Sequence, residues 1–210
     1  MTGPPTDPYR HLARYYDLVL SPMMRYRQLA VRELGVTRGS TVLDIGCGTG
    51  LSFAALEDVV GPQGRIIGVE PSHDMRLRAG ERARANGWTN VELVESGAED
   101  LQPATPADGA LLFLTHDVLR SRQAMDAVLR AVRPGGRIVA LGAQAPAHAP
   151  RVKRLVVRLL TRRFVRSLDQ LDKPWRRLEQ AVGEVKVRSL LAGGAFLLVV
   201  EVPALSRLSD

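Results

Sequence analysis

The stretch Asp44-Ile45-Gly46-Cys47-Gly48-Thr49-Gly50 decides the fold. It follows the β-rich run 41–43 and precedes the helix-like run 51–60, so it marks a turn from a strand into a helix. Glycines at alternate positions let a backbone approach a ligand closely, because they carry no Cβ. The next β-rich run, 65–69, is followed by Glu70, about 20 residues past the turn, where an acid is placed to bind a ribose diol. The spacing therefore predicts a site for a nucleoside cofactor.

The residues around this turn separate two classes of cofactor. The dinucleotide fingerprint is Gly-x-Gly-x-x-Gly, with a pyrophosphate on the helix N-terminus. Here the spacing is Gly-x-Gly-x-Gly, preceded by Asp44. A carboxylate at the turn suits a pyrophosphate poorly, whereas it suits a tail that carries an ammonium and a sulfonium. The turn therefore favours S-adenosylmethionine, and an NAD-binding oxidoreductase is the alternative.

The chain resembles the class I S-adenosylmethionine-dependent methyltransferases over residues 9–143. The resemblance lies in five motifs that follow one another in the family's order: 42–50, 67–72 with Met75, 91–99, 110–117 and 129–139. The helix with Tyr16-Asp17, the glycine motif and Thr115-His116-Asp117 are similar to the bacterial group that includes ubiquinone/menaquinone and phosphatidylethanolamine methyltransferases.

The pattern of apolar runs agrees with an α/β fold. Strand-like runs at 41–46, 65–70, 91–96, 109–114 and 137–142 alternate with helical runs at 51–60, 73–86 and 121–132. Near-continuous apolar strands that alternate with helices predict a doubly wound, Rossmann-like parallel sheet with helices on both faces. Two further strands, 184–191 and 195–202, are joined by a turn so short that they must be antiparallel. The expected sheet has seven strands, mostly parallel, with this C-terminal hairpin.

The length of 210 residues predicts a single domain. We expect an N-terminal helical lid over 1–35, a cofactor-binding core over 36–143, a basic helical segment over 150–182 and the hairpin over 184–202.

The resemblance implies a set of contacts to S-adenosylmethionine. Asp44 takes the ammonium, Glu70 the ribose hydroxyls, and Met75 lies near the adenine or ribose. The full set of cofactor-binding residues is Tyr16, Asp44, Gly46, Cys47, Gly48, Gly50, Glu70, Pro71, Met75, Gly97, Ala98, Glu99 and Thr115. One position departs from the family, because an acid often precedes the small Ala98 and here it is Gly97. Glu99 or Asp100 is the candidate substitute.

The candidate catalytic residues are His116, Asp117 and Tyr16. A histidine at the end of the fourth strand can take a proton from an incoming amine or hydroxyl near neutral pH. The alternative is that His116 only shapes the pocket or caps the following helix. Methyl transfer needs in-line geometry with reacting atoms about 3–3.5 Å apart, so positioning dominates and no base is required. No metal site is predicted.

The charge of the chain is unevenly placed. Residues 1–150 carry 16 basic and 16 acidic side chains, whereas residues 151–188 carry 12 and 4. Within 151–166, apolar and arginine side chains recur on separate helical faces, so this helix can bind an anionic substrate or an anionic membrane surface, or can simply be solvated. Aromatic side chains are too sparse there for base stacking, which makes nucleic acid an unfavoured partner.

A single cysteine, Cys47, excludes an internal disulfide and indicates a cytoplasmic protein, with peripheral membrane contact as an alternative.

Composition and patterning leave the identity of the methyl acceptor open. The first choice of acceptor is an amine, either a phospholipid headgroup or a natural product, and a phenol or quinone-ring carbon comes second. A non-methylating protein that keeps the fold and the cofactor is the remaining alternative.

Overall fold

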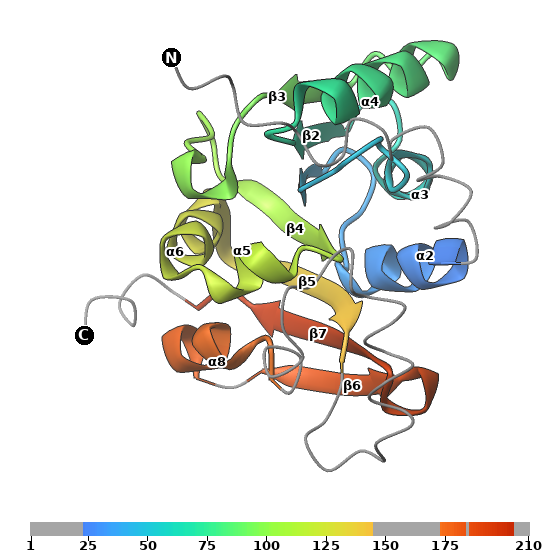
Figure 1. The fold of residues 1–210 in the computed structure, drawn as a ribbon. Coiled ribbons are helices and arrows are strands. Elements are labelled where there is room, and N and C mark those ends of the chain that lie inside the picture. The colour runs from blue at the N-terminus through green and yellow to red at the C-terminus, as the bar shows by residue number, and fades with distance from the viewer. Residues whose placement is uncertain (1–22, 145–172, 184, 204–210) are drawn as a thin grey trace, which may run out of the picture.

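The computed structural model describes residues 23–144, 173–183 and 185–203. These residues form a seven-stranded sheet in the order β3-β2-β1-β4-β5-β7-β6 (Figure 1). The strands, in chain order, are β1 (Thr41–Ile45), β2 (Arg65–Val69), β3 (Val91–Val94), β4 (Ala107–Phe113), β5 (Val132–Ala143), β6 (Lys186–Leu190) and β7 (Ala195–Glu201). The predicted number of strands is confirmed.

The pairing of the strands also follows the prediction. β1 pairs in parallel with β2 and β4, β2 with β3, and β4 with β5. β7 runs antiparallel to both β5 and β6. The chain crosses from β3, at one edge, to β4 on the far side of β1. Sheets of this kind bind ligands beyond the carboxyl ends of the strands at such a switch point.

Helices cover both faces of the sheet, as Figure 1 shows. One face carries α2 (Met24–Glu33), α3 (Phe53–Val60) and α4 (His73–Ala85), and the other carries α5 (His116–Arg120), α6 (Arg122–Ala131) and α8 (Arg176–Val182). Successive strand side chains point to opposite faces. In β1, Val42 therefore packs into the core under α2 and α3, and Leu43 into the core under α6. This alternation produces two apolar layers around one sheet.

Two elements differ from the sequence-based expectation. A short helix, α5, follows β4 directly, so His116 and Asp117 lie in its first turn and not at the strand's end. β5 begins at Val132, earlier than predicted, because Val132 pairs with Ala107 before a register shift in the β4–β5 ladder.

Two predicted segments lie outside the described residues. They are the helix with Tyr16 and the basic helix 151–166. Within the described ranges, no helix is long and apolar enough to cross a membrane.

Candidate functional site

The glycine turn lies at the carboxyl end of β1 and folds across the end of β2. Gly46 N and Cys47 N both donate to the Val69 carbonyl oxygen, at 2.8 and 3.1 Å. Gly46 has a φ of +65°, and a Cβ on it would lie 2.5 Å from Thr115 Cγ2 at the end of β4. Both the left-handed backbone and the close approach of β4 require glycine at position 46.

Asp44 points into the core beneath this turn. Its side chain is only 1% exposed. Burial raises the pKa of Asp44 to about 7, and Glu70 adds to the rise, although the Arg27 guanidinium and a hydrogen bond with Ser52 hold it lower. In the described part of the chain, Asp44 Oδ2 is buried and has no hydrogen-bond partner. A buried carboxylate oxygen in this state is suited to a cationic donor from a ligand.

Arg27, in α2, is the buried cation beside Asp44. It is 4% exposed, its Nη1 donates to Ser52 Oγ at 2.8 Å, and its guanidinium carbon lies 3.9 Å from the centre of the Phe113 ring. Stacking on an aromatic face partly replaces the water that the guanidinium loses. The sequence reasoning missed Arg27. Its signal was its spacing from Ala30 and Val31, which places all three on the buried side of α2.

Glu70 follows β2 and is held by backbone donors from two turns. Its Oε2 accepts from Gly48 N at 2.9 Å, and its Oε1 accepts from Ser72 N at 2.9 Å. The carboxylate is 9% exposed. A carboxylate oxygen can accept more than one hydrogen bond, so the fixed carboxylate is suited to hydroxyl donors from a ligand. This geometry suits the predicted ribose contact.

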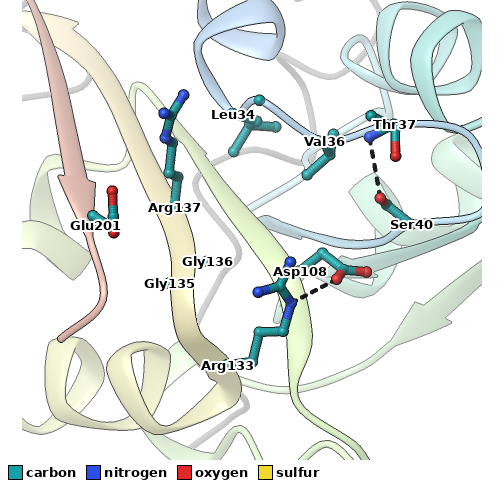
Figure 2. Close-up of a pocket in the computed structure, with 11 residues that line it drawn as sticks. Leu34, Val36, Thr37, Ser40, Asp108, Arg133, Gly135, Gly136, Arg137 and Glu201 are labelled. Carbon is teal, nitrogen blue, oxygen red and sulfur yellow. Dashed lines mark hydrogen bonds and ion pairs between the residues drawn. The ribbon is translucent and has the colours of Figure 1, made fainter. Parts of the chain in front are cut away.

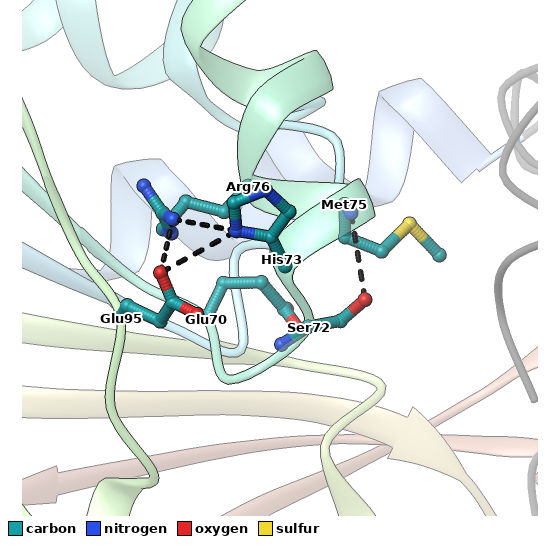
Figure 3. Close-up of polar contacts among 6 residues, drawn as sticks. All are labelled: Glu70, Ser72, His73, Met75, Arg76 and Glu95. Atoms are coloured by element: carbon teal, nitrogen blue, oxygen red, sulfur yellow. Dashed lines mark hydrogen bonds and ion pairs between the residues drawn. The ribbon is translucent and has the colours of Figure 1, made fainter. Parts of the chain in front are cut away.

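The wall beyond Glu70 is built by the start of α4 (Figure 3). Ser72 caps this helix, because its Oγ accepts from Met75 N at 3.4 Å, and Met75 is 3% exposed. Arg76 forms an ion pair with Glu95, just past β3, and His73 Nδ1 lies 3.6 Å from the same carboxylate. These contacts tie α4 to the end of β3 beside the candidate site.

The chain leaves β4 through a strained residue. Leu114 has a φ of 64°, a left-handed conformation that costs a leucine roughly 1–3 kcal/mol. This bend brings Thr115 against Gly46 and starts α5 at the next residue. Backbone strain of this kind gathers at functional sites, where it fixes side-chain directions.

His116 is buried, at 5% exposed, and its ring meets Phe196 edge-on. Its Nε2 lies 3.1 Å from the Ala143 carbonyl oxygen. A carbonyl oxygen only accepts, so we assign the hydrogen to Nε2, which leaves the lone pair of the neutral ring on Nδ1. Burial lowers the pKa of His116 below its usual value, although the backbones of Ala143 and Leu114 oppose this. The ring is therefore neutral near pH 7, and a base role stays a prediction.

Several buried polar atoms without partners lie at the carboxyl ends of adjacent strands. In the described ranges they include Asp44 Oδ2 near the end of β1, Thr115 Oγ1 and His116 Nδ1 after β4, and Gln144 Oε1 after β5. β1, β4 and β5 are adjacent strands. Because buried polar atoms are normally hydrogen-bonded, each of these is a candidate contact for a polar ligand at this end of the sheet.

The other predicted site residues lie around this edge. Cys47 is 6% exposed, and burial, with Asp44 and Glu70 nearby, raises its thiol pKa well above the usual range, so it packs and is not a nucleophile. Pro71 and Asp117 are exposed, and Ala98 is buried at the start of a 3₁₀ turn, η2 (Ala98–Asp100). The chain's other candidate, Tyr16, is outside the described residues.

A polar pocket of about 180 Å³ lies at the opposite end of the strands from Asp44 and Glu70 (Figure 2). It is lined by the amino-terminal ends of β4 and β5, with Asp108, Arg133 and Arg137. Asp108 accepts from Arg133 Nε and from Thr41 N, both at 2.8 Å, so its polar groups satisfy one another. This pocket is separate from Asp44 and Glu70, and it has the features of a structural ion pair.

Comparisons with known proteins bear on the same region. Residues 42–136 match the family described as a methyltransferase domain. The chain is 29% identical over 151 residues to a demethylmenaquinone methyltransferase of Shouchella clausii, covering 67% of this chain and 63% of that protein. It is 31% identical over 110 residues to a protein-L-isoaspartate O-methyltransferase of Ignicoccus hospitalis, covering 52% and 50%.

Solved structures agree at the level of the fold. The N-methyltransferase NodS of Bradyrhizobium japonicum superposes with a TM-score of 0.62 at 17% identity, covering 87% of this chain and 98% of that one. The chain spans about three fifths and one half of the length of the two sequence relatives. These proteins act on different acceptors by their names, so they agree on the domain and leave the acceptor open.

Proposed function

We propose that this chain is a class I S-adenosylmethionine-dependent methyltransferase, which transfers a methyl group from that cofactor to a small-molecule acceptor. The observation that carries the proposal is the pair of carboxylates at neighbouring strand ends. Asp44 offers a buried, unpartnered oxygen near the end of β1, and Glu70 is fixed by two backbone donors after β2. A nucleoside with a cationic tail carries an ammonium suited to Asp44 and ribose hydroxyls suited to Glu70.

The residues of the chain fit this cofactor. Asp44 would hold the ammonium of the methionine tail, and Glu70 would accept from the ribose hydroxyls, which fixes the nucleoside along the edge from β1 to β2. The turn from Gly46 to Gly50 would pack against the tail between them. A buried carboxylate beneath this turn disfavours the pyrophosphate of NAD, which argues against the oxidoreductase alternative.

When bound, S-adenosylmethionine supplies an electrophilic methyl group on a sulfonium. The protein's contribution is then mainly to position the acceptor, because charge is dispersed during methyl transfer. Thr115 Oγ1, His116 Nδ1 and Gln144 Oε1 are the polar atoms available to orient it. His116, neutral with its lone pair on Nδ1, would take the proton from an acceptor hydroxyl or amine.

For the acceptor we propose a quinol-type ring first and an amine second. The reversal of the order expected from the sequence rests on the demethylmenaquinone methyltransferases among the relatives, which are named for a quinone acceptor. Thr115 Oγ1, His116 Nδ1 and Gln144 Oε1 suit an acceptor with O–H or N–H groups. The experiment therefore includes both quinols and amines. A membrane contact through 151–166 also stays a prediction.

The test is an acceptor screen that measures release of S-adenosylhomocysteine. Purified protein and S-adenosylmethionine are incubated separately with a demethylated naphthoquinol, with phosphatidylethanolamine vesicles and with small amines. We expect methylated naphthoquinol as the main product. Binding of S-adenosylhomocysteine with no product from any acceptor would support the non-methylating alternative. Binding of NAD without binding of S-adenosylhomocysteine would overturn the proposal.

A further inference from the structure

We infer that Glu99 is a specificity-determining residue that accepts a hydrogen bond from the exocyclic amine of adenine, in place of an acidic side chain on residue 97. This inference rests on the proposed function, because it concerns the base end of the same nucleoside. It identifies which of the acids after β3 recognises the base.

The backbone at Gly97 does not require glycine. Its φ of −69° and ψ of 159° are extended values that any residue adopts. Gly46, in contrast, has a left-handed backbone. Glycine at position 97 instead leaves open the volume that a side chain would fill.

The space beside Gly97 is taken by the Glu99 carboxylate. A Cβ on Gly97 would lie 2.6 Å from Glu99 Cδ and Oε1 and 2.8 Å from Oε2. Cβ atoms essentially never approach other heavy atoms that closely, so any side chain on residue 97 would displace this carboxylate. The Glu99 side chain folds back and brings its oxygens into the volume that a short side chain on residue 97 would fill.

The order of the strand ends determines which part of a bound nucleoside the Glu99 carboxylate can contact. Asp44 is near the end of β1, Glu70 follows β2, and Gly97 follows β3, the next strand. The ends of β2 and β3 are tied by Glu70 N, which donates to the Val94 carbonyl oxygen at 3.1 Å. With the tail at β1 and the ribose at β2, the base extends toward β3 and Glu99.

Glu95, a neighbouring acid, is less suited to this role. Glu95 is committed to Arg76 and His73, which Figure 3 shows. Glu99 makes no hydrogen bond or ion pair within the described part of the chain, so both of its oxygens are available. An amine donates and a carboxylate accepts, whereas the carbonyl of hypoxanthine at the same position would face a carboxylate without a hydrogen. Glu99 therefore selects adenine over hypoxanthine.

The experiment compares two ligands that differ only at this group, S-adenosylhomocysteine and S-inosylhomocysteine, by isothermal titration calorimetry. The wild-type protein should prefer the adenine ligand at least about tenfold, the lower end for a hydrogen bond to a charged group. Glu99→Ala should reduce the preference to less than about threefold. The matched control, Asp100→Ala, removes the adjacent exposed carboxylate and should keep the wild-type preference. Gly97→Asp combined with Glu99→Ala should restore it.

The outcomes are distinguishable. Retention of the full preference by Glu99→Ala, or an equal loss in Asp100→Ala, overturns the role of Glu99 and leaves the proposed function intact. Failure of the wild-type protein to bind either ligand overturns both. Circular dichroism of each variant confirms folding, which we expect because Glu99 is exposed.

Discussion

Replacement of Asp44 by asparagine should stabilise the ligand-free protein while weakening its cofactor site. The substitution keeps the size of the side chain and an oxygen for Ser52, and removes the titrating group. The pKa of Asp44 rises from 3.8 to about 7 on folding. At about 1.4 kcal/mol per pH unit, ionising this group in the folded state costs up to about 4 kcal/mol.

The sign of the pH dependence follows from the direction of this shift. A raised pKa means that the folded state holds a proton that the unfolded state releases above pH 3.8. The free energy of unfolding therefore falls as the pH rises from about 4 to about 7, because the unfolded chain releases the Asp44 proton and the folded chain keeps it. Above that range the decrease is complete. Asparagine mimics the protonated acid at every pH, so the variant avoids the loss.

The assay is urea unfolding of the wild-type protein and Asp44→Asn from about pH 4 to about pH 9. The variant should match the wild type at the acid end and exceed it by up to about 4 kcal/mol at the alkaline end. Asp58→Asn, on the exposed side of α3, is the matched control and should show no such divergence. The titration of His116 is common to both proteins and cancels. A pH-independent difference, or a variant less stable above pH 7, would refute the reasoning.

Arg27 provides a second check on the same electrostatics. Its positive charge lowers the pKa of Asp44. In Arg27→Met the pKa of Asp44 should therefore rise further, so the pH below which S-adenosylhomocysteine affinity falls should move upward from about 7. Calorimetric titrations with S-adenosylhomocysteine at several pH values around 7 would measure the shift. An unchanged pH midpoint of the affinity would contradict the interaction between Arg27 and Asp44.

Three further outcomes are expected. Glu70→Gln should weaken binding of S-adenosylhomocysteine by about 1.5–3 kcal/mol, measured by calorimetry, whereas Glu81→Gln, on the exposed side of α4, should leave it unchanged; equal affinities would remove the ribose assignment. His116→Gln should abolish the acid limb of the pH profile of kcat/KM, which we expect below pH 6.5 because burial lowers the pKa of the imidazole; an unaltered profile would exclude a base role. Gly46→Ala should destabilise the protein by at least about 1 kcal/mol in urea unfolding, owing to its φ of +65°, and unchanged stability would contradict the close packing at the glycine turn.

The sequence predicts the sheet well because its signals are local and repeated. Each apolar run between turn residues became a strand, and the short Ala192-Gly193-Gly194 connection forced β6 and β7 to be antiparallel. The positions of Asp44 and Glu70 were also predictable, because each lies at or beside the end of its own strand. These features depend on neighbours in the chain.

Other features depend on contacts between distant residues, which a single sequence does not display. Arg27 reaches Ser52 and Phe113 across the core, and no local pattern marks that contact. The short helix α5 arises from the strained bend at Leu114. In the sequence, Gly97 is only a departure from the family pattern, and the structure is needed to show that the Glu99 carboxylate lies beside it.

The most direct test of the central claim is a calorimetric titration of the wild-type protein with S-adenosylhomocysteine, repeated with NAD. A nucleoside held by Asp44 and Glu70 predicts saturable binding of one S-adenosylhomocysteine per chain and no heat from NAD. The absence of binding to S-adenosylhomocysteine, or saturable binding of NAD, would contradict the assignment of this sheet edge as a methyltransferase cofactor site.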